Sequence, residues 1–259
     1  MSTLSLALLQ QAASLDPAAN RDALGPLGHR LGPATDLVVL PEAFMRDFGR
    51  PGSDIGPFAE PLDGPFVEAL AGFAREHETT VVAGMFEASA DPGRPYNTLA
   101  VVDAGGLRAS YRKIHLYDSF GYRESDRLCA GEVQPVTVEV GRVTVGLMTC
   151  YDLRFPELAR ELVRRGAQLL VVPSAWVAGP AKVDHWVTLV RARAIENTVF
   201  VAAVGQPGPR YSGHSLVVGP AGEDLGRLGD GQGVLTARVD TGDLDRARRE
   251  NPSLLNRRL

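Results

Sequence analysis

Short apolar runs of strand length recur along the whole chain, and stretches with helical periodicity separate many of them. Runs of this length, rich in branched residues and bounded by Gly, Pro or Asp, favour buried strands over buried helices. The expected strands are 4–9, 37–41, 80–86, 97–103, 107–112, 135–140, 143–149, 168–173, 199–204, 214–218 and 233–239. Many strands with interspersed helices are typical of a layered α/β architecture, which is the fold class that we predict.

Helical periodicity and end signals predict three clear helices, at 65–77, 156–165 and 181–197. A further helix near 17–31 should be broken, because Gly25-Pro26 interrupts it. The short connection between 97–103 and 107–112 predicts an antiparallel pair. No Ser/Gly linker or charge block divides the sequence, so we expect one domain over residues 1–259.

One charged residue in the 181–197 segment has two open interpretations. Arg193 continues a stripe that begins with Trp186, Leu189 and Val190. It either extends into solvent, as helical charges usually do, or pairs with Glu196 three residues later.

Composition excludes several function classes. The formal net charge of −4 and the pI near 5.8 give no electrostatic reason to expect nucleic acid or an anionic membrane as a partner. The five histidines are scattered without metal-ligand spacing, so we predict no metal and no cofactor. No apolar run approaches the roughly 18 residues that span a bilayer. Two cysteines cannot make a disulfide framework and suit a reducing compartment, so we expect a cytoplasmic protein.

Cys150 directly follows the apolar run 143–149, and a helix is expected to begin a few residues later. A nucleophile on such a strand–turn–helix elbow lies near free backbone N–H groups that can bind an oxyanion. Glu42 and Lys113 also follow expected strands, and together they offer a base and a cation to a thiol. A cysteine at a strand end is nevertheless more often a small buried hydrophobic residue, and sequence separation alone does not show that the three meet.

The residues around these three carry a resemblance to a known family. LPEAF at 40–44, YRKIHLYD at 111–118 and CYDLRFPEL at 150–158 resemble motifs of the nitrilase superfamily of carbon–nitrogen hydrolases. Three further segments are similar to patterns of this family: PSAW at 173–176, RARAIEN at 191–197 and the HW pair that precedes RARAIEN. The resemblance implies a four-layer αββα sandwich and a catalytic triad of Glu42, Lys113 and Cys150. It also implies a homodimer formed through the helices after the nucleophile strand and around RARAIEN.

The resemblance extends to residues around the triad. FGYRES at 120–125 looks like the usual setting of a second family glutamate, which points to Glu124, and Asn97 resembles a family position that is structural as much as catalytic. Arg154 either faces a substrate carboxylate or makes an ion pair that stabilises the fold. The residues expected to bind substrate are Tyr117, Tyr151, Arg154 and Trp176.

The implied reaction is hydrolysis of a small, carboxylate-bearing amide to an acid and ammonia through a thioester on Cys150. Nitrile-cleaving members usually show CWE, whereas this chain has CYD at 150–152, which resembles amidases acting on ω-amides or deaminated glutathione. A carbamoyl amino acid hydrolase or a nitrilase on the same triad is the catalytic alternative. From other classes, a catalytically idle binding module and a redox protein using Cys129 with Cys150 remain open, although no CxxC motif is present.

Overall fold

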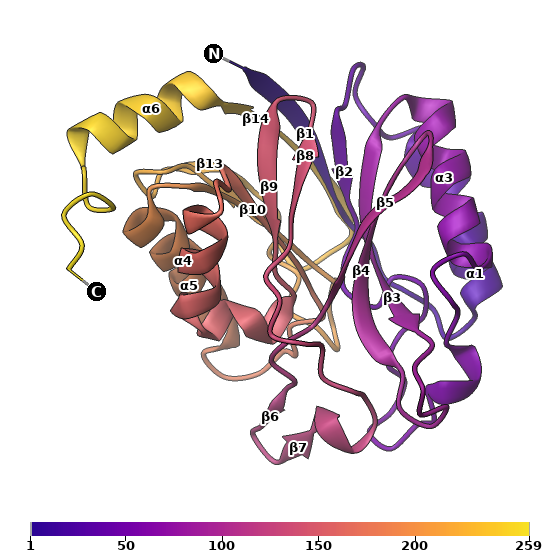
Figure 1. Cartoon of the computed structure of the whole chain (residues 1–259). Helices are drawn as coiled ribbons and strands as arrows, with labels where there is room; N and C mark the ends of the chain where they lie inside the picture. The colour runs from indigo at the N-terminus through magenta and orange to yellow at the C-terminus, as the bar shows by residue number, and fades with distance from the viewer. Residues whose placement is uncertain (1, 259) are drawn as a thin grey trace.

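Two six-stranded β-sheets pack face to face, and helices cover the outer face of each (Figure 1). The computed structural model describes residues 2–258. One outer layer holds α1 (Pro17–Asp22), α2 (Leu24–Gly28) and α3 (Pro65–His77), and the other holds α4 (Pro156–Arg164) and α5 (Lys182–Asn197). The predicted α/β class with four αββα layers is therefore confirmed.

The first sheet has the strand order β14-β1-β2-β3-β4-β5. In the centre of this sheet, β2 pairs in parallel with β1 and with β3. The outer pairs, β14 with β1, β3 with β4 and β4 with β5, are antiparallel. The expected antiparallel pairing of 97–103 with 107–112 is confirmed by β4 and β5. The strands are β1 (Thr3–Gln10), β2 (Leu37–Val39), β3 (Thr80–Glu87), β4 (Tyr96–Asp103), β5 (Gly106–Arg112) and β14 (Gly233–Asp240).

The second sheet repeats this plan in the order β13-β12-β11-β10-β9-β8. Here β9, β10 and β11 form the parallel centre, and the outer pairs are antiparallel. A two-stranded hairpin of β6 (Asp118–Ser119) and β7 (Tyr122–Arg123) lies outside both sheets. The strands of the second sheet are β8 (Thr137–Val140), β9 (Val143–Leu147), β10 (Leu169–Ser174), β11 (Phe200–Gly205), β12 (Leu216–Val218) and β13 (Asp224–Arg227).

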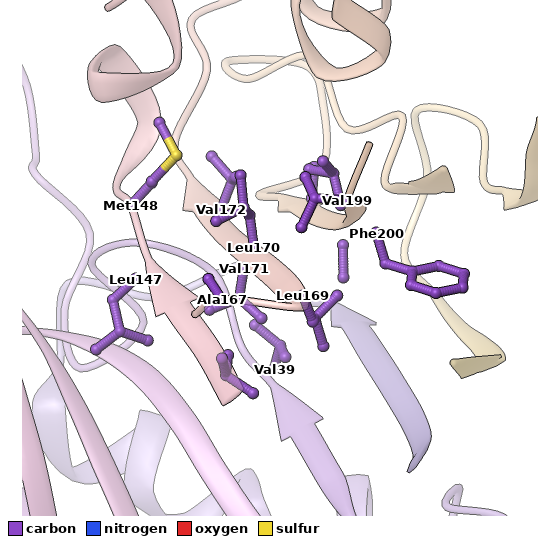
Figure 2. Close-up of a cluster of buried hydrophobic side chains, with 14 of the residues drawn as sticks. Val39, Leu147, Met148, Ala167, Leu169, Leu170, Val171, Val172, Val199 and Phe200 are labelled. Carbon is purple, nitrogen blue, oxygen red and sulfur yellow. The ribbon is translucent and has the colours of Figure 1, made fainter. Parts of the chain in front are cut away.

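Most central strands are buried on both faces, which explains their uninterrupted apolar sequences. In β2, Leu37 and Val39 belong to the core between the sheets, whereas Val38 faces the α1–α3 layer. Figure 2 shows part of the inter-sheet core, where Val39 lies in one cluster with Leu147 of β9 and with residues of β10. Burying both faces fixes the strand register, because a slip of one residue would exchange the two sets of side chains.

The first helical segment is broken as expected, but two residues before Gly25-Pro26. The break lies at Ala23, between α1 and α2, and Gly25-Pro26 lies inside α2. Pro26 has no N–H to donate to the carbonyl of Asp22, and its ring crowds that carbonyl, so the helix is interrupted there.

Strand β13 and helix α6 are among the elements that had no sequence prediction. Strand β13 (Asp224–Arg227) has no apolar run and pairs only at the edge of the second sheet. Helix α6 (Thr241–Glu250) is almost entirely polar, with Leu244 as its buried apolar residue, and the Asp240 side chain caps it by accepting from the Gly242 N–H. In Figure 1, α6 lies beyond β14, near the α4–α5 side of the sandwich.

Arg193 is paired and buried, so the solvent-exposed interpretation is wrong. Its side chain is 5% exposed, and its Nη1 lies 2.8 Å from Glu196. Its Nε also donates to the carbonyl of Leu153 at 3.0 Å, which attaches α5 to the segment that follows β9.

In residues 2–258 the longest helix is α5 with 16 residues, and none of the helices there has the length and apolar character needed to span a bilayer.

Gly84 allows the segment that follows β2 to lie directly against β3. Its N–H donates to the carbonyl of Pro41, and its carbonyl accepts from the N–H of Met45. A Cβ at this position would lie 2.4 Å from the backbone nitrogen of Ala43 and 2.6 Å from the Cα of Glu42. This close approach therefore fixes the backbone that carries Glu42.

We expect Gly84→Ala to lower the free energy of unfolding by about 1–3 kcal/mol, because the methyl group would collide with backbone rather than with a flexible side chain. Urea denaturation at fixed pH measures the effect. Gly72→Ala is the matched control, since nothing lies within 4 Å of its added Cβ in α3, and it should stabilise by about 0.5–1 kcal/mol. Equal stability of Gly84→Ala and the unaltered protein would contradict this account.

Candidate active site

A cavity of about 410 Å³ opens where the ends of strands from both sheets meet. Three charged side chains and one thiol that line it are almost fully buried: Glu42, Lys113, Glu124 and Cys150. Each comes from a different segment, since Glu42 follows β2, Lys113 follows β5, Glu124 begins a short 3₁₀ helix (Glu124–Asp126) and Cys150 begins another (Cys150–Arg154). The structure thus brings together the four residues that the sequence singled out.

Lys113 lies between the two glutamates. Its Nζ is 2.9 Å from Oε1 of Glu42 and 2.9 Å from Oε2 of Glu124. Burial alone would lower the pKa of Lys113, but the carboxylates of Glu124 and Glu42 outweigh it and raise that pKa well above its ordinary value. The ammonium is therefore charged at neutral pH.

Neutral donors complete the solvation of the two carboxylates. The amide of Asn97 donates to Glu42 at 2.8 Å and to Glu124 at 3.2 Å. The N–H of Ala175 donates to Oε2 of Glu42 at 2.6 Å, and that of Tyr117 to Glu124 at 2.6 Å. Because each buried charge has several hydrogen-bond partners, the cluster avoids most of the desolvation penalty of isolated buried ions.

Cys150 occupies a strained turn. Its φ is +47°, in the left-handed region that costs a non-glycine residue energy, and its side chain is 8% exposed. Within residues 2–258 the N–H of the next residue, Tyr151, donates to no acceptor. Burial and the Glu42 carboxylate raise the pKa of the Cys150 thiol well above its ordinary value, although Lys113 opposes them. The free site therefore holds a neutral thiol, a nearby base and an open N–H donor.

Asp152 ties the cysteine turn to the segment that carries Lys113. It is fully buried, and its Oδ2 accepts from the Tyr111 hydroxyl at 2.7 Å and from the Thr149 N–H at 2.9 Å. Its Oδ1 accepts from the N–H of His115 at 3.1 Å and lies 2.8 Å from the Nδ1 of that ring. The sequence argument gave Asp152 no role, because a carboxylate after a cysteine has no distinguishing pattern of its own.

The four residues expected to bind substrate, Tyr117, Tyr151, Arg154 and Trp176, all line the cavity. The guanidinium of Arg154 lies 4.9 Å from the ring centroid of Trp176, and within residues 2–258 no carboxylate lies within 4.0 Å of it. The alternative of a fold-stabilising ion pair is thus wrong for the described chain. Lys182 and Phe120 also line the cavity, and the sequence analysis named neither as a substrate-binding residue.

Other kinds of site have little support in the structure. In the described part of the chain, no group of three His, Cys, Asp or Glu side chains is placed to hold a metal ion. Both cysteines are free, and the sulfur of Cys129 lies among the side chains of Ser89 and Arg94, whereas Cys150 faces the cavity.

Comparison with known proteins gives the family. The carbon–nitrogen hydrolase family profile matches residues 5–249. The chain belongs to the carbon–nitrogen hydrolase family. The resemblance stated from the motifs is confirmed, and the protein is an amidase-like enzyme of this family.

Relatives and solved structures of this carbon–nitrogen hydrolase cover nearly all of its length. The deaminated glutathione amidase of Escherichia coli O157:H7 is 39% identical over 223 residues, 86% of this chain and 84% of that protein. A superfamily member from Xanthomonas campestris, with an arsenic adduct in its active site, has a TM-score of 0.89 at 31% identity and covers 100% and 98% of the two chains. A variant amidase from Nesterenkonia sp. AN1, with the acetamide moiety of fluoroacetamide on its active-site cysteine, has a TM-score of 0.79 at 31% identity over 98% and 94%.

We expect Asp152→Asn to destabilise this hydrolase by about 2–4 kcal/mol, because the amide nitrogen cannot accept and leaves buried donors unpaired. Tyr111→Phe is the control: it removes one of the four hydrogen bonds and should cost about 1 kcal/mol. Urea denaturation of both variants provides the measurement. If Asp152→Asn cost no more than Tyr111→Phe, the tie between the two segments would not depend on the carboxylate.

The raised thiol pKa predicts how Cys150 reacts with iodoacetamide, since only the thiolate is alkylated. In a Cys129→Ser background, half-maximal alkylation should occur at higher pH than for a free cysteine, whose pKa is about 8.5. Glu42→Gln removes the neighbouring negative charge and should move this midpoint to lower pH. Lys113→Met removes the positive charge and should move it to higher pH. Coincident midpoints in all three proteins would show that these charges do not control the thiol.

Proposed function

We propose that the chain is a cysteine-dependent amidase that hydrolyses a small, carboxylate-bearing amide through a thioester acyl-enzyme. Cys150 is the nucleophile, Glu42 the general base and acid, and Lys113 the oxyanion-binding cation, with Glu124 holding Lys113 in place. The observation that carries the proposal is the contact of one buried ammonium with two carboxylates in the cavity that the thiol lines.

The first half-reaction follows from the protonation states of the site. Cys150 begins as a neutral thiol, so Glu42 takes its proton as the sulfur attacks the amide carbonyl. Negative charge then develops on the carbonyl oxygen, and the Lys113 ammonium and the open N–H of Tyr151 stabilise it. Glu42 passes the same proton to the departing nitrogen, the C–N bond breaks, and a thioester remains on Cys150.

The second half-reaction returns the site to its starting state. Glu42 takes a proton from water, whose oxygen attacks the thioester carbonyl, and Lys113 and Tyr151 again stabilise the oxyanion. The C–S bond breaks, the thiolate regains its proton from Glu42, and the carboxylic acid leaves. The amine released earlier is ammonia when the amide is primary. The covalent adduct on the active-site cysteine of the Nesterenkonia amidase supports a covalent intermediate here.

The cavity favours an anionic substrate. Arg154 lines it with Nε and Nη2 buried and without hydrogen-bond partners in residues 2–258. A guanidinium binds a carboxylate strongly, and Arg154 has no acidic partner in the described chain, so its charge is available to a substrate carboxylate. The relative named deaminated glutathione amidase supports the same choice of substrate class.

The single domain over residues 1–259 and the homodimer implied by the motifs stay predictions.

We expect Cys150→Ala, Glu42→Gln and Lys113→Ala each to lower amide turnover by at least about 10²-fold, because each removes a group that acts in both half-reactions. The assay follows ammonia release from ω-amides, carbamoyl amino acids and nitriles, with intact-mass detection of a thioester on Cys150. Cys129→Ser is the control and should keep full turnover.

Undiminished hydrolysis by Cys150→Ala would reject the proposal. Release of carbon dioxide together with ammonia would instead identify a carbamoyl amino acid hydrolase, and a preference for nitriles would identify a nitrilase. Normal ligand binding with no turnover of any of these compounds would identify a binding module.

A further inference from the structure

The peptide that joins Glu42 to Ala43 is buried and lies in a strained turn. Ala43 has a φ of +55°, in the left-handed region that costs a non-glycine residue energy. Glu42 is 1% exposed and Ala43 is fully buried. A strained conformation persists only where the surrounding structure determines it. The contacts of the Glu42 carbonyl therefore help to set where the backbone of the proposed general base lies.

The side chain of Gln206 makes the contact with this carbonyl. Gln206 is 1% exposed and directly follows β11, and its Nε2 donates to the Glu42 carbonyl at 2.9 Å. Its Oε1 accepts from the N–H of Ala13 at 3.1 Å. These two partners fix the orientation of the amide, because only its nitrogen can donate to a carbonyl. Within residues 2–258 no other group donates to the Glu42 carbonyl.

The backbone of Gln206 is itself held in place. Its N–H donates to the carbonyl of Ser174, and its carbonyl accepts from the N–H of Gly213, both at 2.9 Å. Ser174 ends β10, and the next residue, Ala175, donates its N–H to the carboxylate of Glu42. The ends of β10 and β11 thus hold Glu42 at two points, the carboxylate through Ala175 and the main-chain carbonyl through Gln206.

Gln206 has no direct access to a substrate. It is not among the residues that line the cavity, so an effect on the reaction must pass through Glu42. Gly84 of the first sheet already holds the backbone of this segment, and Gln206 holds it from the second sheet. Misplacing a catalytic group by 1 Å costs up to about 10²-fold in rate, so both attachments bear on proton transfer.

We propose that Gln206 is a positioning residue for the amidase reaction, which places Glu42 for proton transfer with Cys150 by binding the main-chain carbonyl of Glu42. The inference rests on the proposed function. Its consequence is that loss of the Gln206 amide lowers kcat and changes the environment of the Cys150 thiol, while substrate binding stays nearly the same.

Gln206→Met tests this inference, because methionine has a similar size and can neither donate to Glu42 nor accept from Ala13. The kcat for ammonia release from glutarate monoamide should fall about 10–10²-fold, with KM changed less than threefold. In a Cys129→Ser background, the pH of half-maximal alkylation of Cys150 by iodoacetamide should move lower. This direction follows because a displaced Glu42 carboxylate no longer raises the pKa of the thiol to the same extent.

Gln10→Met is the matched control for a merely structural role. Gln10 is a fully buried glutamine at the end of β1, and it does not line the cavity. Its Nε2 donates to the carbonyls of Gly229 and Gly231, and its Oε1 accepts from the N–H and hydroxyl of Ser215. Gln10→Met should lower the urea midpoint at least as much as Gln206→Met, because it removes more buried hydrogen bonds. Its kcat and alkylation midpoint should match those of the unaltered protein.

Gln206→Glu isolates the bond to Glu42. The ionised side chain keeps an acceptor for Ala13 but places a second acceptor against the Glu42 carbonyl, so kcat at pH 9 should fall as far as in Gln206→Met. At low pH the introduced carboxyl gains a proton, and its O–H can then donate to that carbonyl. The ratio of the Gln206→Glu kcat to the Gln206→Met kcat should therefore rise as the pH falls. If Gln206→Met does not fold, this variant decides the test.

The inference is overturned if both Gln206 variants keep kcat within twofold at pH 9, if they raise KM with kcat unchanged, or if Gln10→Met changes kcat and the alkylation midpoint as much as they do. An unaltered protein that releases no ammonia from any amide would reject the proposed amidase function. The alkylation midpoints then decide the role of Gln206 by themselves: a lower midpoint in Gln206→Met upholds its control of Glu42, and an unchanged midpoint rejects it.

Discussion

The buried ammonium of Lys113 between two carboxylates is the interaction on which the site depends. Removing charges from water is costly, and such a cluster is stable only when each member is paired and hydrogen-bonded. Glu42 and Glu124 satisfy Lys113, while Asn97 and two backbone N–H groups satisfy the carboxylates. The cluster therefore exists only when several loops are all in place.

Both sheets contribute residues to the site. The first supplies Glu42 and Lys113 at the ends of β2 and β5, and the second supplies Cys150 after β9. Asp152 connects the cysteine turn to the Lys113 segment, and Gly84 lets the Glu42 segment dock on β3. Packing of the apolar faces between the sheets thus brings a base, a cation and a thiol together, so the chemistry depends on the core as much as on its own residues.

The charged groups of the cavity include two sets: Lys113, which is paired with two buried carboxylates, and Arg154 and Lys182, which have no carboxylate within 4.0 Å in residues 2–258. The first set suits catalysis, because the two carboxylates raise the pKa of Lys113 and keep its ammonium charged in the cavity that Cys150 lines. The second set can attract an anionic ligand, because neither cation has an acidic partner in the described chain.

The sequence by itself determined the layered α/β class, most strand positions and helix α3, because long apolar periodicities and end signals are local properties. It also picked out Glu42, Lys113 and Cys150, through motifs rather than through geometry. Only the tertiary structure decided that these residues meet, that Arg193 is buried, and that Lys182 lines the cavity without an acidic partner in residues 2–258. Each of these facts is set by contacts between segments far apart in the chain, and a charge at a helix start gives no local sign of whether a distant carboxylate will neutralise it.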